Sequence, residues 1–159
     1  MPAMADTLVP GDVLLYRANG FYGRLIALKT WHPISHVEVY AGDGQSEASR
    51  DGVGVGRYLL RTDGLTHVLR PVHPAFNWAS GDAWFRAVEG QPYGWLDLLQ
   101  FVGLPVNGPG MVCSPFVAGR LRASGLPIFN AEPVEKIAPC TFLLSELLVD
   151  VTDSALFGG

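Results

Sequence analysis

The chain has 159 residues, 48% of them hydrophobic, which is enough to bury the core of a single domain spanning 1–159. Its net charge of −4 argues against a surface that binds the phosphates of a nucleic acid. Gly103, Pro105, Asn107 and Pro109 interrupt the most apolar region. No run therefore approaches the roughly 20 apolar residues of a membrane span, and we expect no integral membrane segment.

The two cysteines, Cys113 and Cys140, are too few for a disulfide framework. The first residues also lack the basic stretch and apolar run of a secretory signal. We therefore expect a reducing compartment and a cytoplasmic location by default. No feature of the sequence points to a particular oligomeric state.

Apolar periodicity predicts strands in the first half of the chain and helices in the second. In chain order we expect a strand over 13–17, a helix over 21–31, a strand over 35–41, a second short strand containing Glu47, and strands over 53–58 and 66–70. Helices are then expected over 83–88, 95–102, 113–123 and 141–148, before a last strand at 149–151. Strands followed by helices indicate an α+β domain with an antiparallel sheet.

Cys113 is a candidate nucleophile because it stands where the helix over 113–123 begins. A helix N-terminus favours the thiolate, which is the reactive form of cysteine, and its free N–H groups can bind a developing oxyanion. Pro115 suits the first turn of a helix, where a missing N–H costs nothing. A buried structural cysteine is nevertheless the commoner role for an isolated thiol.

His36 is the candidate base for this thiol. It alternates with Val37 on the predicted strand over 35–41, so it lies on the polar face, and imidazole is the usual partner of a catalytic cysteine. The similar segment around His67 shows that the local pattern alone is weak.

A base of this kind needs a third group that orients the imidazole, and Glu47 and Glu38 are the candidates. If Tyr40 pairs with Gln45 across the hairpin, Glu47 lies one diagonal step from His36 on the same face. We therefore favour Glu47 and keep Glu38 as the alternative third member.

A metal site is the competing interpretation, since His32 and His36 are four residues apart. The proline after His32 breaks the helix that would align the two rings, and no CxxC motif or third clustered ligand follows. We therefore expect no metal and no cofactor.

Several short segments occur in the order typical of a known family. They are Pro10-Gly11-Asp12-Val13-Leu14, Ser35-His36-Val37-Glu38-Val39-Tyr40, Gly42-Asp43-Gly44, Ser46-Glu47-Ala48, Tyr93, Cys113-Ser114 and Ala138-Pro139. With the histidine before the cysteine, the chain resembles the circularly permuted branch of the NlpC-like, papain-fold cysteine hydrolases, which includes YiiX-like bacterial proteins and lecithin retinol acyltransferase relatives. The matching segments cover most of the domain.

This resemblance implies a papain-like fold, with an antiparallel sheet packed against helices and the nucleophile at a helix N-terminus. It implies Cys113 as nucleophile, His36 as base and Glu47 as the third polar member. The reaction it implies is acyl transfer from an amide or ester through a thioester, usually to water.

Further residues are expected to line such a site, namely Tyr16, Tyr93 and Ser114. The sequence departs from the family at Val112, where an aromatic residue is frequent, and at Pro115, where glutamate is frequent. Both departures concern substrate contacts near the nucleophile.

The first functional hypothesis is accordingly a cysteine peptidase or amidase that acts on a small peptide, with a peptidoglycan stem peptide as one candidate. A cell-wall role would require delivery by a phage or a secretion system. The alternative is a lipid ester or amide hydrolase or acyltransferase acting on a lipid-like acyl group. A hypothesis of another class is a catalytically silent binding or assembly module.

Overall fold

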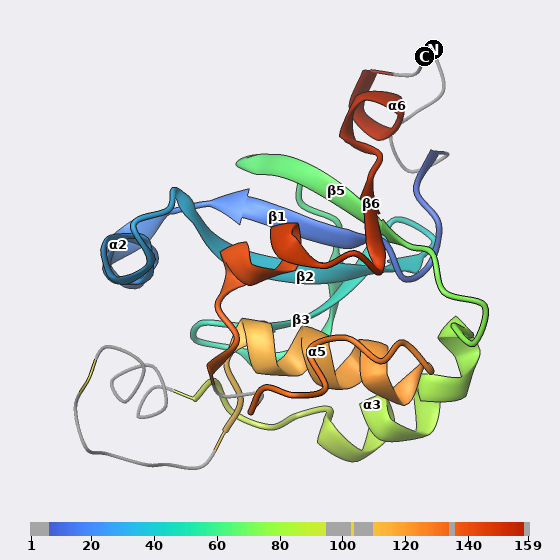
Figure 1. Ribbon diagram of the computed structural model, residues 1–159. Helices are drawn as coiled ribbons and strands as arrows, with labels where there is room; N and C mark the ends of the chain where they lie inside the picture. Colours follow the sequence, from blue (N-terminus) through green and yellow to red (C-terminus); the bar gives the residue numbers. More distant parts are fainter. Residues whose placement is uncertain (1–6, 95–102, 104–109, 134–135, 158–159) are drawn as a thin grey trace.

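A six-stranded antiparallel sheet forms the centre of the structure (Figure 1). The computed structural model describes residues 7–94, 103, 110–133 and 136–157. The strands are β1 (Val13–Arg17), β2 (Ile34–Gly42), β3 (Gln45–Arg50), β4 (Gly54–Leu59), β5 (Leu65–Pro71) and β6 (Leu148–Asp150). They lie in the order β4-β3-β2-β1-β5-β6, and each neighbouring pair is antiparallel.

The helices flank this sheet and lie mainly in the second half of the chain. They are α2 (Gly20–Thr30), η1 (Trp78–Gly81), α3 (Asp82–Val88), α5 (Cys113–Ala123), η3 (Pro139–Leu144) and α6 (Thr152–Phe157), where η1 and η3 are 3₁₀ helices. The α+β class with an antiparallel sheet is thus confirmed.

Most expected elements are found within a residue or two of their predicted bounds. The helix expected over 95–102 lies outside the described residues. The helix expected over 141–148 is wrong, because a 3₁₀ helix occupies 139–144 and the chain is already extended from Leu148. Helix α6 was not expected, since six residues are too few to show a helical period.

The central strand β1 is buried on both faces, which explains its continuous apolar run. Val13 and Leu15 belong to the main core, where α5 packs against β2 and β3. Leu14 and Tyr16 point to the other face and form a smaller core, which α6 joins through Ala155. The first residue of α5 is therefore held against the middle of the sheet.

The turn between β2 and β3 sets the register of the hairpin. Asp43 and its two flanking glycines all have positive φ angles, between 51° and 100°, and a bulge follows Tyr40. Tyr40 consequently pairs with Ser46, and Val39 pairs with Glu47. The expected pairing of Tyr40 with Gln45 is wrong by one residue.

Candidate active site

Cys113 is the first residue of α5 and is 2% exposed. The residue before it, Val112, has extended backbone angles and provides no side-chain cap, so the first turn of the helix keeps free N–H groups. The chain reaches this point through Gly110, whose φ of 119° and contact with the carbonyl of Pro92 leave no room for a Cβ. The helix thus starts on a tight loop, with the thiol at its positive end.

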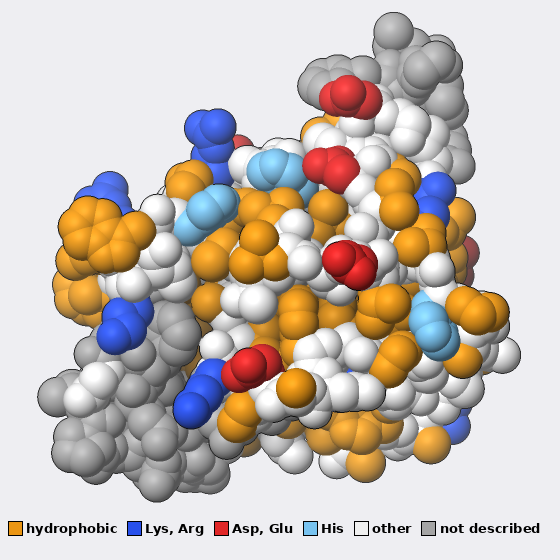
Figure 2. Space-filling model, in the orientation of Figure 1, with side chains coloured by type: hydrophobic (Ala, Val, Ile, Leu, Met, Phe, Trp, Pro, Cys, Tyr) orange, Lys and Arg blue, Asp and Glu red, His pale blue; other side chains and the backbone are white. Residues whose placement is uncertain are grey.

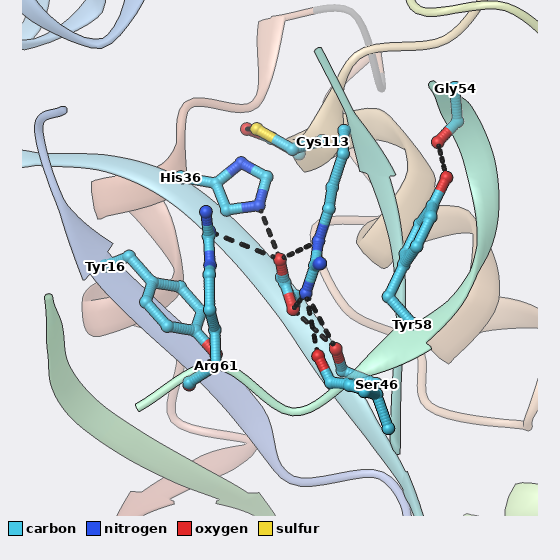
Figure 3. Close-up of polar contacts among 11 residues, drawn as sticks. Tyr16, His36, Ser46, Gly54, Tyr58, Arg61 and Cys113 are labelled. Carbon is cyan, nitrogen blue, oxygen red and sulfur yellow. Dashed lines mark hydrogen bonds and ion pairs between the residues drawn. The ribbon is translucent and has the colours of Figure 1, made fainter. Parts of the chain in front are cut away.

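His36 on β2 interacts with both the thiol and a carboxylate (Figure 3). One ring nitrogen, Nε2, lies 2.9 Å from Oε1 of Glu38, and the other nitrogen faces the sulfur of Cys113. The backbone N–H of Val37 also favours the thiolate form of this sulfur. The structure therefore brings together Cys113 and His36, which are 77 positions apart in the sequence.

The electrostatics of these groups favour a thiolate and an imidazolium. Burial opposes the charged form of His36, but its hydrogen bonds with Cys113 and Glu38 outweigh burial and raise its pKa to about 9. Burial likewise opposes the thiolate of Cys113, but the hydrogen bond with His36 and its positive charge lower the thiol pKa below the ordinary value. Both shifts favour the thiolate and imidazolium ion pair, which is the state a cysteine nucleophile needs.

Glu38 is a fully buried carboxylate surrounded by donors. It accepts hydrogen bonds from Ser46 Oγ at 2.5 Å and from Arg50 Nε at 2.8 Å, and Arg61 Nη2 lies 3.4 Å away. Despite burial, the hydrogen bonds from His36 and Arg50 lower its pKa to about 2. Glu38 is therefore ionised over the whole pH range in which the Cys113 thiolate forms.

The two arginines in this cluster were not anticipated from the sequence. Arg50 also lies over the ring of Tyr58 at 4.5 Å, and Arg61 lies over that of Tyr16 at 4.9 Å. A usable signal for Arg50 was its spacing of four from Ser46, which places both on one face of β3. Arg61 lies in the loop between β4 and β5, where no pattern of apolar residues shows which way a side chain points.

The expected position of Glu47 beside His36 is wrong. Because Val39 pairs with Glu47, strand alternation places Glu47 on the face opposite to Glu38, toward α5. There its carboxylate binds Arg120 Nε at 2.7 Å and Arg57 Nη2 at 2.6 Å. Glu38, the alternative third member, is the carboxylate that contacts the imidazole.

Glu47 instead helps to anchor the helix that carries the thiol. Arg120 is fully buried in α5, and its guanidinium also donates to Asp82 at the start of α3. A Cβ on Gly81 would collide with this guanidinium, so only glycine lets the backbone of η1 approach it. The remaining contacts of the guanidinium are to Ser124 Oγ, the carbonyl of Trp78 and the face of its ring.

The three further expected residues all lie near the thiol or the imidazole. The Tyr16 ring is tilted against His36 at 5.8 Å, and burial together with Glu38 raises its pKa. Burial and the negative sulfur of Cys113 raise the pKa of Tyr93. The Ser114 hydroxyl lies 3.8 Å from the sulfur. Both tyrosines thus stay protonated at the pH at which the thiolate forms.

A pocket of about 680 Å³ opens beside the imidazole. Its wall includes His36, Tyr16 and Tyr93, together with residues of α2 such as Phe21 and Ile26. The imidazole is 19% exposed by its side chain, so it is within reach of a bound molecule. A pocket of this size can hold a small acyl group and part of its leaving group.

The other histidines do not join this site. His32 accepts a hydrogen bond from the backbone of Ile34, and His67 interacts with Thr66 at a separate pocket. The part of the chain that the structure describes holds no cluster of three metal-ligating side chains.

No family model matches the chain, and a search of curated proteins found no match either. Among the described residues, no helix has the length and apolar character needed to cross a bilayer.

Proposed function

We propose that this protein is a cysteine hydrolase that cleaves an amide bond through a thioester, with Cys113 as nucleophile, His36 as general base and acid, and Glu38 as the orienting carboxylate. The observation that carries the proposal is the contact chain from the thiol at the start of α5, through the imidazole, to a buried carboxylate. Two of these three residues also occur in the family that the sequence resembles.

The residues divide the reaction in the way a thiol hydrolase requires. The Cys113 thiolate attacks the acyl carbonyl, and the free N–H groups at the start of α5 are placed to bind the resulting oxyanion. The imidazolium of His36 then gives its proton to the leaving amine, and the thioester forms. His36, now neutral, takes a proton from water, which attacks the thioester and releases the acid and the thiol.

Glu38 supports the imidazolium during this cycle. Its bond to Nε2 orients the ring so that the opposite nitrogen faces the sulfur. Arg50 and Ser46 hold the carboxylate in place, so that the imidazole meets a charge whose position is set in advance. This preorganisation favours the ion pair without any movement during the reaction.

A lipid-like ester is the second candidate substrate. The apolar side chains of Phe21 and Ile26 line one side of the pocket and would suit a short acyl chain. A peptide amide would use the same nucleophile and base, so the two substrate classes differ only in what the pocket holds.

The proposal is tested by acylation with p-nitrophenyl acetate. Wild-type protein and Cys140→Ala are expected to release about one equivalent of p-nitrophenolate rapidly and to carry an acetyl group on Cys113, located by peptide mass spectrometry. Cys113→Ala should fold, as judged by circular dichroism, and show no burst. A wild-type protein that folds but acetylates Cys113 no faster than Cys140 would identify the fold as a silent binding module instead.

A further inference from the structure

Helix α2 presents an apolar stripe to solvent. Phe21, Leu28 and Trp31 are 68%, 65% and 89% exposed, respectively. Phe21, Arg24 and Leu28 follow a spacing of three and four residues, which places their side chains on one side of the helix, and Trp31 follows at the C-cap. The opposite side of α2 packs on β2, where Ile26 is buried. The stripe therefore faces away from the core that the described residues form.

The charged side chains of the segment that contains α2 are all positive, whereas Asp51 and Asp63 lie across the neighbouring pocket. Residues 13–37 contain Arg17, Arg24 and Lys29, each of them exposed, and no aspartate or glutamate. The whole chain has 15 acidic and 11 basic residues, so this segment departs from the charge of the rest of the protein. Figure 2 shows hydrophobic side chains gathered over α2, at the left of the view, with basic side chains beside them.

We propose that α2 is an interfacial helix that docks the protein on a membrane surface containing anionic lipids. Aromatic and leucine side chains bordered by arginine and lysine are the composition of helices that lie in the headgroup region. Tryptophan in particular favours this region, because its ring is apolar and its N–H is polar. The basic residues would face anionic headgroups, each of them adding to the attraction.

A second copy of the chain is a poorer occupant of the same face. In a two-fold symmetric dimer the patch meets itself, so Arg17, Arg24 and Lys29 would face the same three cations. The segment offers no carboxylate to neutralise them. An anionic surface meets this face without that repulsion.

Docking through α2 would also bring the candidate active site to the membrane. Gly20, Phe21 and Ile26 form part of the pocket wall that includes His36. The pocket would thus open beside the lipid surface, although docking itself requires no catalytic activity.

The experiment is vesicle flotation with the full chain carrying Cys113→Ser, so that binding is measured apart from turnover. We expect binding to vesicles of phosphatidylcholine and phosphatidylserine in equal parts, and at least about tenfold weaker binding to phosphatidylcholine alone. The double variant Leu28→Ala/Trp31→Ala removes only exposed side chains and should weaken binding to the mixed vesicles by about tenfold or more. Arg24→Gln/Lys29→Gln should do the same, and added salt should weaken binding of the parent protein.

A matched control removes exposed apolar side chains elsewhere. Val72 and Val149 are 52% and 47% exposed on the β5 and β6 side of the sheet, and Val72→Ala/Val149→Ala should bind as the parent does. The proposal is overturned if the parent protein binds neither vesicle, or if the α2 and control variants bind equally. It is also overturned if sedimentation shows a dimer that Leu28→Ala/Trp31→Ala abolishes, because the face would then belong to a second copy.

Discussion

Replacing Glu38 by glutamine tests the electrostatic basis of the candidate site most directly. Glutamine has nearly the same shape and can still accept the hydrogen bond from His36, so the substitution mainly removes a charge. That charge is fully buried, 2.9 Å from the imidazole and 2.8 Å from Arg50. The substitution leaves the guanidinium of Arg50 close to the imidazole with no carboxylate between them.

The size of the effect follows from the pKa of His36. Its rise from 6.5 to about 9 corresponds to about 3 kcal/mol in favour of the imidazolium, because a change of one in pKa is worth about 1.4 kcal/mol. Cys113 and Glu38 both raise this pKa against the effect of burial, so without the charge of Glu38 we expect it to fall below 9 while the contribution of Cys113 remains. A lower pKa of His36 leaves a smaller fraction of the protein as the ion pair at neutral pH. With the ring no longer held by a charge, acylation should slow by about 100-fold.

The assay is the burst of p-nitrophenolate followed across pH, together with an NMR titration of the His36 ring. The alkaline limb of the wild-type rate profile should lie near pH 9 and move to lower pH in Glu38→Gln. Glu47→Gln is the matched control, because it changes a buried carboxylate on the other face of the same hairpin and should keep the wild-type limb. If Glu38→Gln keeps the wild-type alkaline limb and acylation rate, Glu38 is not the carboxylate that orients His36. If the alkaline limb shifts in Glu47→Gln, that role belongs to Glu47.

Three further outcomes are expected. Arg120→Met should lower the free energy of unfolding in urea by about 3 kcal/mol, because the buried carboxylate of Glu47 then loses one arginine partner and keeps Arg57 as the other; a loss below about 1 kcal/mol would contradict this. The pKa of Glu38 is about 2 in the folded protein and 4.5 for an ordinary glutamate, so its ionised form should stabilise the fold by about 3 kcal/mol above pH 4.5. This contribution should be lost as the pH falls through 2, and wild-type urea midpoints that stay constant below pH 4.5 would contradict it. Iodoacetamide should alkylate Cys113 faster than Cys140 at neutral pH, and His67→Ala should leave that rate unchanged; a slowed rate would move the base to His67.

The sequence by itself was sufficient to predict the α+β class and most of the elements. Alternating and helical apolar periods are local properties, so β2 and α5 could be located without any knowledge of their neighbours. Cys113 and His36 could be selected in the same way, since a helix start and the polar face of a strand are both visible in a few adjacent residues. That the two lie together is a tertiary fact, because the packing of α5 on β2 determines it.

The identity of the carboxylate beside His36 was decided only by the tertiary structure. Side chains on a strand alternate with a period of two, so the one-residue difference in the β2 and β3 register turns Glu47 to the face of α5. The bulge after Tyr40 that produces this register has no distinct signature in the sequence. Arg61 reaches Glu38 from a loop, and no local pattern in the sequence shows this contact. Strand pairing and the turns between strands determine which distant side chains meet.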